Sequence, residues 1–109
     1  MANEVATEVK EDLKEAAETR LDRLMAQGAA AVVDLSKPVR GMDHIPLRHP
    51  SASDLRGIKL LDLINMDTVS LELVVPRIAM NGFTKHDFLN LEPKDMFSIG
   101  LQVSGFFAL

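Results

Sequence analysis

Three histidines are the first candidates for chemistry in this sequence, because imidazole is a common zinc ligand. His44 and His49 are five residues apart, and His86 stands beside Asp87. A zinc site needs three or four converging ligands, usually with local spacings such as HxxxH or CxxC, and the sequence contains neither. We therefore predict no metal site and interpret the histidines as surface or turn residues.

Serines and carboxylates give no better support for catalysis. No serine stands in a G-x-S-x-G elbow, and Ser51 and Ser53 suit a helix cap. The glycines are scattered, so no Gly-rich loop is present to cradle a phosphate. Carboxylates such as Asp62 and Asp67 are available as an acid–base pair, but each stands where a helix cap or a solvated face requires one. We predict that the protein is not an enzyme and binds no cofactor.

The composition is that of one small domain without a strongly basic or membrane-spanning part. The chain has 109 residues, 47% of them hydrophobic, and no cysteine, so one aliphatic core is expected and disulfides are excluded. Residues 1–27 hold seven acidic and four basic side chains, and the formal net charge is −4. Nucleic-acid binding lacks electrostatic support, and the longest apolar run, residues 29–33, is far too short for a bilayer. We expect a soluble protein with no nucleic-acid or membrane partner.

The first 28 residues are predicted to form a helical arm. Residues 3 to about 26 contain neither Pro nor Gly and are rich in strong helix formers, and Gly28 is a natural stop. An apolar residue recurs at every fourth position, which makes a broad stripe that winds around the helix. The stripe consists of Val5, Val9, Leu13, Ala17, Leu21 and Met25. Such a helix suits contact with a partner or with the body of the protein; a solvated extension is the alternative.

A β-hairpin is predicted at about residues 30–49. β-Branched residues precede a polar connection centred near residues 41–43, and Ile45 and Leu47 follow it. An isolated hairpin is marginal in water. We therefore expect it to pack on helices or to pair with a strand of another copy.

Four helix starts are predicted between residues 51 and 107. Each combines a capping side chain or a first-turn proline with a following apolar stretch. The starts are Ser51 with Asp54, Asp67, Thr84 with Asp87, and Pro93. The first helix should carry Leu55 and Ile58, and the second should be central to the core and bend or end at Pro76. The last should bury one face, formed by Met96, Ile99, Val103 and Phe106.

The expected fold class is therefore mainly α with a small β-hairpin (α+β). An N-terminal amphipathic helix, residues 1–28, precedes a domain at 30–107, in which the hairpin joins a compact bundle of short helices at about 51–107. Helices at about 84–91 and 93–107 have the layout of a helix-turn-helix. However, the last helix offers only Lys94 and Gln102 to base edges among apolar side chains, which favours protein contacts over DNA.

Several short motifs in a fixed order resemble those of a known family. They are L-S-K-P and I-P-L-R-H-P, then L-R-G-I-K-L-L-D-L-I-N-M-D, V-V-P-R-I, F-T-K-H-D-F-L-N-L-E-P-K-D and I-G-L-Q-V-S-G-F-F. Together they cover roughly residues 33–107. This stretch is similar to the tail assembly chaperone family of contractile-tailed bacteriophages. The arm has no counterpart in that resemblance.

The resemblance implies a non-catalytic protein that binds and solubilises the tape measure protein in the host cytoplasm and is absent from the mature virion. Its other implied partners are a frameshift-extended form of itself, the tail tube protein and further copies of the chain. Phe106 and Phe107 stand where a slippery T-run would be encoded, so the chain is expected to be the short form. The alternatives are a structural tail component retained in the virion and a helix-turn-helix regulator.

Partner contacts are predicted for two groups of residues. Arg48, Arg56 and Arg77 belong to the motifs R-H-P, L-R-G and P-R-I. They either pair with Asp54, Asp62 or Asp67 and fix angles between elements, or hold a partner's carboxylates and backbone. The second group is apolar and consists of Met96, Ile99, Val103, Phe106 and Phe107.

Overall fold

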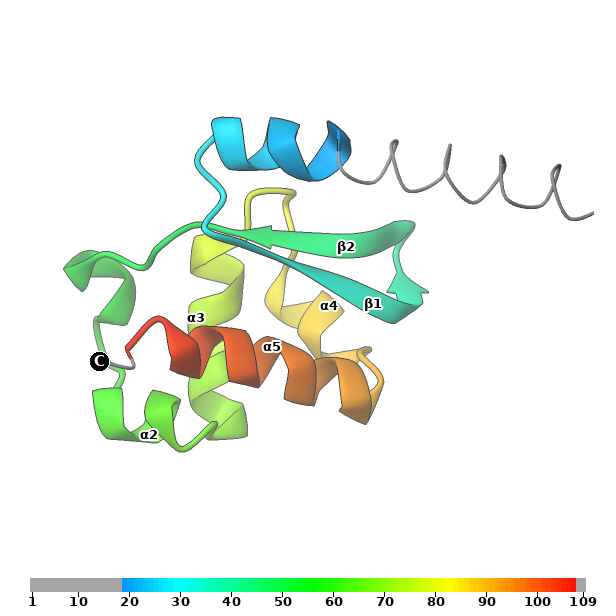
Figure 1. Cartoon of the computed structure of the whole chain (residues 1–109). Helices are drawn as coiled ribbons and strands as arrows, with labels where there is room; N and C mark the ends of the chain where they lie inside the picture. Colours follow the sequence, from blue (N-terminus) through cyan, green and yellow to red (C-terminus); the bar gives the residue numbers. More distant parts are fainter. Residues whose placement is uncertain (1–18, 108–109) are drawn as a thin grey trace, which may run out of the picture.

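The computed structural model describes residues 19–107 and shows a hairpin over a group of short helices (Figure 1). A helix at residues 19–26 comes first. The later elements are β1 (Ala31–Val39), β2 (Met42–Leu47), the 3-10 helix η1 (Ala52–Leu55), α2 (Leu60–Ile64), α3 (Thr68–Ile78), α4 (Lys85–Leu89) and α5 (Pro93–Gly105). The predicted α+β class is confirmed, while the arm before residue 19 lies outside the described residues.

The hairpin and α5 organise the domain. β1 and β2 pair antiparallel and pack on α5, which also contacts α2, while α3 contacts η1, α2 and α4. The helix at 19–26 lies along the hairpin, on the side opposite to α2 (Figure 1). The hairpin therefore packs on helices of its own chain, which is one of the two arrangements that the sequence predicted.

The hairpin turn explains where the two strands meet. Arg40 and Gly41 both have positive φ values, 49° and 78°, as a two-residue turn that matches strand twist requires. The connection therefore falls at residues 40–41, slightly earlier than the predicted centre at 41–43. Regular pairing runs from Ala31–Leu47 to Asp34–His44, and then only Val39 and Met42 pair again. Residues 35–38 of β1 are thus left free to bond elsewhere.

The predicted caps are confirmed, but two helices differ from expectation. Asp67, Thr84 and Pro93 begin α3, α4 and α5. The Ser51–Asp54 capping box opens η1, a single 3-10 turn, and a separate α2 that the sequence did not reveal follows it.

Pro76 lies late in α3 but does not end it, because the helix continues for two more residues to Ile78. Proline removes only its own N–H from the helix. The Ala79 N–H still bonds to the Val75 carbonyl at 2.9 Å, so the last turn keeps its closure.

One hydrophobic core connects the hairpin with the helices. Phe88 of α4 is its largest fully buried side chain. Its other fully buried hydrophobic members are Ile45, Leu47, Leu63, Val74, Val75, Ile78, Ile99 and Val103. At Gly100, α5 approaches the end of α2 closely, since a Cβ there would lie 2.8 Å from Met66 Cε. The core therefore fixes α5 against both the hairpin and α2.

Candidate partner-binding surface

A buried carboxylate, Asp54, ties three family-like motifs together. Arg48 donates two hydrogen bonds to its carboxylate oxygens, at 2.6 and 2.8 Å, and the Ser51 N–H donates a third at 2.8 Å. Arg77 donates to the Asp54 carbonyl at 2.7 Å and to the Arg56 carbonyl at 2.9 Å. These bonds, above all those from Arg48, hold the pKa of Asp54 well below its usual range. The motifs R-H-P, L-R-G and P-R-I thus meet at one internal junction.

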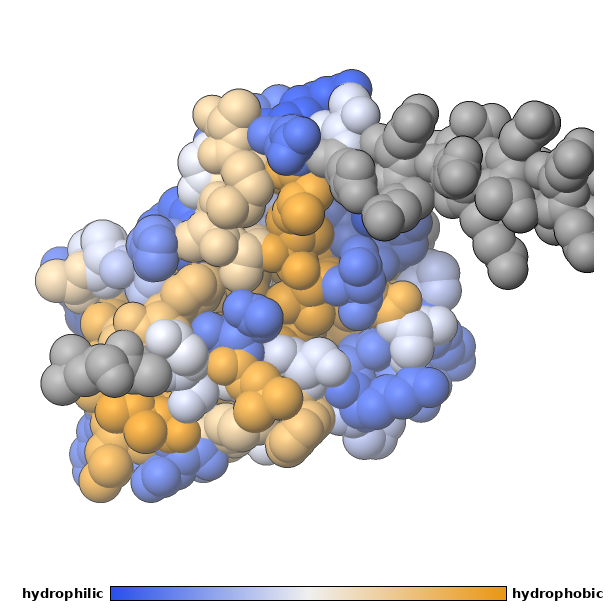
Figure 2. Space-filling view, viewed as in Figure 1, coloured by the Kyte–Doolittle hydropathy of each residue, from blue (hydrophilic) through white to orange (hydrophobic). Residues whose placement is uncertain are grey.

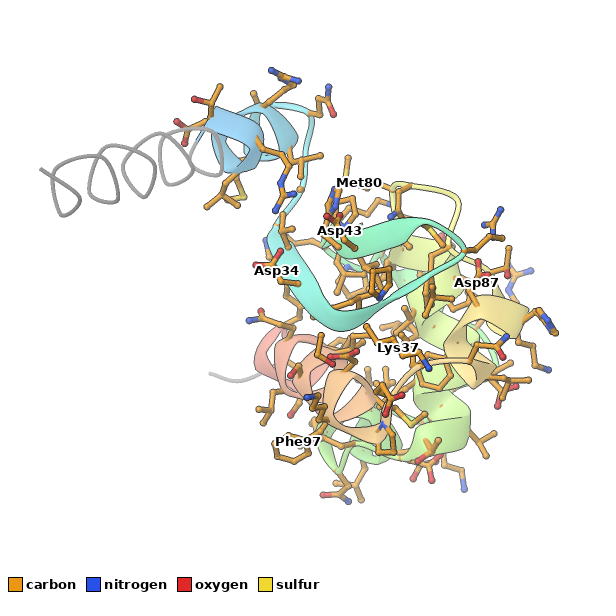
Figure 3. All side chains as sticks on the ribbon, turned by 90° about the vertical axis from the view of Figure 1, so that its right-hand side faces the viewer. Asp34, Lys37, Asp43, Met80, Asp87 and Phe97 are labelled. Atoms are coloured by element: carbon orange, nitrogen blue, oxygen red, sulfur yellow. The ribbon has the colours of Figure 1, made fainter. Side chains whose placement is uncertain are left out.

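A second buried carboxylate, Asp87, joins α4 to the hairpin turn. The Arg40 guanidinium donates to its two oxygens at 2.9–3.3 Å, and the Thr84 N–H donates at 2.9 Å. Figure 3 shows Asp87 beside the end of the hairpin. The bonds from Arg40 and Thr84, opposed by burial, lower the pKa of Asp87 to about 2 from an ordinary 3.8.

The lowered pKa predicts an acid-sensitive domain. Because Asp87 has a lower pKa in the folded than in the unfolded chain, its ionised form stabilises the fold fully above about pH 4, and this contribution disappears as the pH falls toward 2. The melting temperature of the wild type should therefore exceed that of Asp87→Asn at pH 6, and the gap should shrink steadily from about pH 4 to a small remainder at pH 2. A difference in melting temperature that stays constant from pH 6 to pH 2 would show that the negative charge of Asp87 does not stabilise the fold.

The third buried carboxylate, Asp95, binds the irregular part of β1 to α5. Its oxygens accept from the Ser36 N–H and hydroxyl, both at 2.9 Å, and from the Lys37 N–H at 3.3 Å. These N–H groups lie in the part of β1 that does not pair regularly with β2. The motif L-S-K-P is thus joined to the K-D of E-P-K-D, at opposite ends of the family-like stretch. The hydrogen bonds from Ser36 and Lys37 overcome burial and lower the pKa of Asp95.

Three buried carboxylates, Asp54, Asp87 and Asp95, are therefore engaged in hydrogen bonds inside the fold. Each buried carboxylate accepts bonds from neighbouring motifs. Within residues 19–107, no group of three or more histidines, cysteines and carboxylates is placed to hold a metal ion. No helix in the same range has both the length and the apolar character to cross a membrane.

The predicted arginines have different roles in the structure. Arg48 pairs with Asp54, which is one of the two roles predicted for it. Arg77 donates its side-chain hydrogen bonds only to carbonyl groups. Within the described part of the chain, neither Asp62 nor Asp67 forms an ion pair with an arginine. Arg56 is exposed, and its side chain has no bond to another described residue. Arg56 is therefore the one arginine of the three that is placed to meet a partner.

The predicted apolar contacts are mostly part of the core. Ile99 and Val103 are 0% exposed and unavailable to a partner in this conformation. Met96, Phe106 and Phe107 are partly buried against the core, and the Phe106 ring lies 5.2 Å from that of His49. The face that the sequence predicted for α5 is present, but it points inward.

Exposed apolar side chains gather instead on α2 and on the opposite face of α5. We call this the α2–α5 surface, and it consists of Leu60, Leu61, Ile64, Phe97 and Leu101, each 45–65% exposed. The two helices are linked by a hydrogen bond from the Ser104 hydroxyl to the Ile64 carbonyl at 3.0 Å. Figure 2 shows hydrophobic residues over α2, and Figure 3 shows Phe97 pointing away from the body.

A shallow hollow of about 190 Å³ adjoins this surface, lined by Met66, Thr68, Leu71, Pro93, Met96 and Phe97. Phe97 and Leu101 are four residues apart, so their helical spacing was visible in the sequence. The sequence nevertheless favours the inward face of α5 as the apolar one, because that face has the longer apolar pattern. Clustered exposed apolar residues mark an interaction surface more often than scattered ones do.

The chain is similar to two tail assembly proteins of Escherichia phage P2. Tail assembly protein E is 33% identical over 79 residues, which are 69% of this chain and 87% of that protein. Tail assembly protein E' is also 33% identical over 79 residues, but these are 56% of its length, so the chain spans little more than half of it. No family model matches the chain, and no solved structure matches it.

Proposed function

Because the chain belongs to the tail assembly chaperone family of contractile-tailed bacteriophages, we propose that it binds and solubilises the tape measure protein during tail assembly. Its relatives support a role in phage tail assembly. The finer proposal is a non-catalytic chaperone that acts in the host cytoplasm and leaves before the virion is complete. Further proposed partners are the tail tube protein and other copies of the chain.

The observation that carries this proposal is the α2–α5 surface. It presents five exposed apolar side chains on two short helices, next to a hollow lined by methionines and Phe97. Such a surface fits the apolar face of an amphipathic client helix, and methionine adapts to clients of varied shape. A non-enzymatic role is supported by the internal use of Asp54, Asp87 and Asp95.

Co-expression with the tape measure protein of the same phage tests the proposal. The tape measure protein should move from the pellet to the soluble fraction and co-purify with the chain. Phe97→Asp should abolish most of this effect, because a charge would be placed in the apolar contact. Leu89→Asp, at a 62% exposed position on α4 outside the α2–α5 surface, is the matched control and should retain it.

Two results would count against the proposal. A client that is equally insoluble with and without the chain would remove the chaperone function. Stoichiometric amounts of the chain in purified virions would favour a structural tail component instead.

The chain is further proposed to be the shorter product of a frameshifted pair. The same share of this chain, 69%, aligns with E and E' at the same identity, but the aligned part is 87% of E and only 56% of E'. The codons for Phe106 and Phe107 should then contain a run of T bases that overlaps a second reading frame. Codons that end in C, with no overlapping frame, would contradict this proposal.

A further inference from the structure

Negative charge is concentrated at one end of this chain. Residues 1–18 contain six acidic and two basic side chains, whereas the remaining 91 residues contain ten of each. The first 18 residues therefore carry the whole formal net charge of −4. The same segment carries the first part of the apolar stripe that the sequence predicts, at Val5, Val9, Leu13 and Ala17.

The described end of this stripe is only partly covered by the rest of the protein. Leu21 and Met25 are 45% and 48% exposed on the helix at residues 19–26. In sequence, the stripe and its acidic flanks have the pattern of an amphipathic helix that binds an apolar surface with basic surroundings.

Three basic side chains flank the α2–α5 surface, although α2 itself also carries the carboxylate of Asp62. Lys59 directly precedes Leu60, and Arg56 lies four residues before Leu60. On α5, Lys94 lies three residues before Phe97. All three are exposed, and no carboxylate of residues 19–107 lies within ion-pair distance of any of them. Acidic side chains of the body are mostly engaged elsewhere: Asp34, Asp43, Asp54, Glu72, Asp87 and Glu92 all have basic partners.

The geometry favours a second copy over the same chain. The helix at 19–26 lies on the hairpin side, held by Arg20 to Asp34 at 3.4 Å and to Asp43 at 3.9 Å, while α2 and Phe97 lie at the opposite end of the molecule (Figures 1 and 3). Residues 3–26 contain no Gly or Pro at which a helix would reverse its direction. The sequence therefore predicts one continuous helix, and such a helix would not fold back onto the α2 of its own chain.

We infer that residues 1–18 of one copy dock on the α2–α5 surface of a second copy, with the apolar stripe on Phe97, Leu61 and their neighbours and the acidic flanks near Lys59 and Lys94. The contact is head-to-tail, because the two copies contribute different surfaces. It keeps an adhesive apolar surface covered until a client competes for it. Only this last step, competition with the client, rests on the proposed function.

Light scattering on the full-length chain, without any client, tests the contact. At about 100 μM the wild type should have a mass at least about twice the 12.0 kDa of one chain. Leu13→Asp in the arm and Leu61→Asp on the α2–α5 surface should each return the mass to that of one chain, while Leu89→Asp should leave it unchanged. Circular dichroism verifies that each variant is folded. A monomeric wild type, or association that survives both substitutions, would overturn the inference.

Cross-linking separates the possible occupants, because the chain contains no cysteine of its own. A chain with Val9→Cys is mixed with a chain with Ser98→Cys, an exposed position on α5 next to Phe97, and a short bis-maleimide is added. The mixture should yield a linked pair of one chain of each kind, and Leu89→Cys on α4 in place of Ser98→Cys should not. Linkage found only within a doubly substituted chain would show that the arm binds its own body.

The same variants keep the two proposals distinguishable. Leu13→Asp removes the arm from the surface but leaves Phe97 intact, so it should be monomeric and still solubilise the tape measure protein. A monomeric wild type that solubilises the client would overturn the arm contact alone. A wild type that associates through the arm but leaves the client insoluble would overturn the chaperone function alone.

Discussion

Asp54→Ala is expected to lower the free energy of unfolding by about 2–3 kcal/mol, measured by urea denaturation at pH 7. The Asp54 side chain is only 10% exposed, whereas that of Arg48 is 41% exposed. Alanine would remove the acceptor of two hydrogen bonds from Arg48 and one from the Ser51 N–H. The expected loss is below that for a fully buried pair, because water can reach the Arg48 side chain after the substitution.

Asp22→Ala is the control, since Asp22 is exposed on the helix at residues 19–26 and should change stability by less than about 0.5 kcal/mol. The double variant Arg48→Met with Asp54→Ala tests the pairing itself. It should be clearly less destabilised than the sum of the two single variants, because each single variant already breaks the pair. Additive losses would mean that the two side chains do not depend on each other.

Phe88→Ala is expected to cost about 3–5 kcal/mol, the usual range for deleting a buried aromatic ring. Phe88 is 0% exposed and is the largest fully buried side chain. A small domain is stable by about 5–15 kcal/mol, so this substitution would leave it close to unfolding. Calorimetry should show a large fall in melting temperature.

The adjacent Leu89 provides a matched control on the same helix. It is 62% exposed, so Leu89→Ala should change the unfolding free energy by less than about 0.5 kcal/mol. Equal losses at the two positions would mean that α4 docks by a different face than the one described. Neither variant alters the α2–α5 surface, so client binding by folded Leu89→Ala should match that of the wild type.

Short-range sequence signals determine the helix starts and the hairpin turn of this protein most directly. The caps at Asp67 and Thr84 were predicted because a capping side chain bonds to a backbone N–H only a few residues away. The Gly41 turn and the first-turn Pro93 depend on equally short-range sterics. The sequence does not show the division of residues 52–64 into η1 and α2, because it offers one capping box there and Lys59, the N-cap of α2, makes no side-chain cap.

Contacts between distant residues were predicted less well. The pairing of Arg48 with Asp54 was among the options because the residues are six apart, but the bonds from Ser36 and Lys37 to Asp95 span 58–59 residues and were not predicted. The short motifs show only that these residues stand in an order that resembles the family's. They did not show that the motifs bind one another.

The sequence by itself determined the element types, most helix starts, the α+β class and the family, because these follow from local sterics, helical spacing and ordered motifs. Tertiary structure alone decided which apolar residues face a partner. Ile99 and Phe97 lie two residues apart on α5, yet one is fully buried and the other is 59% exposed. Periodicity shows that a helix has apolar faces, but only packing against the hairpin and α2 determines which face is covered.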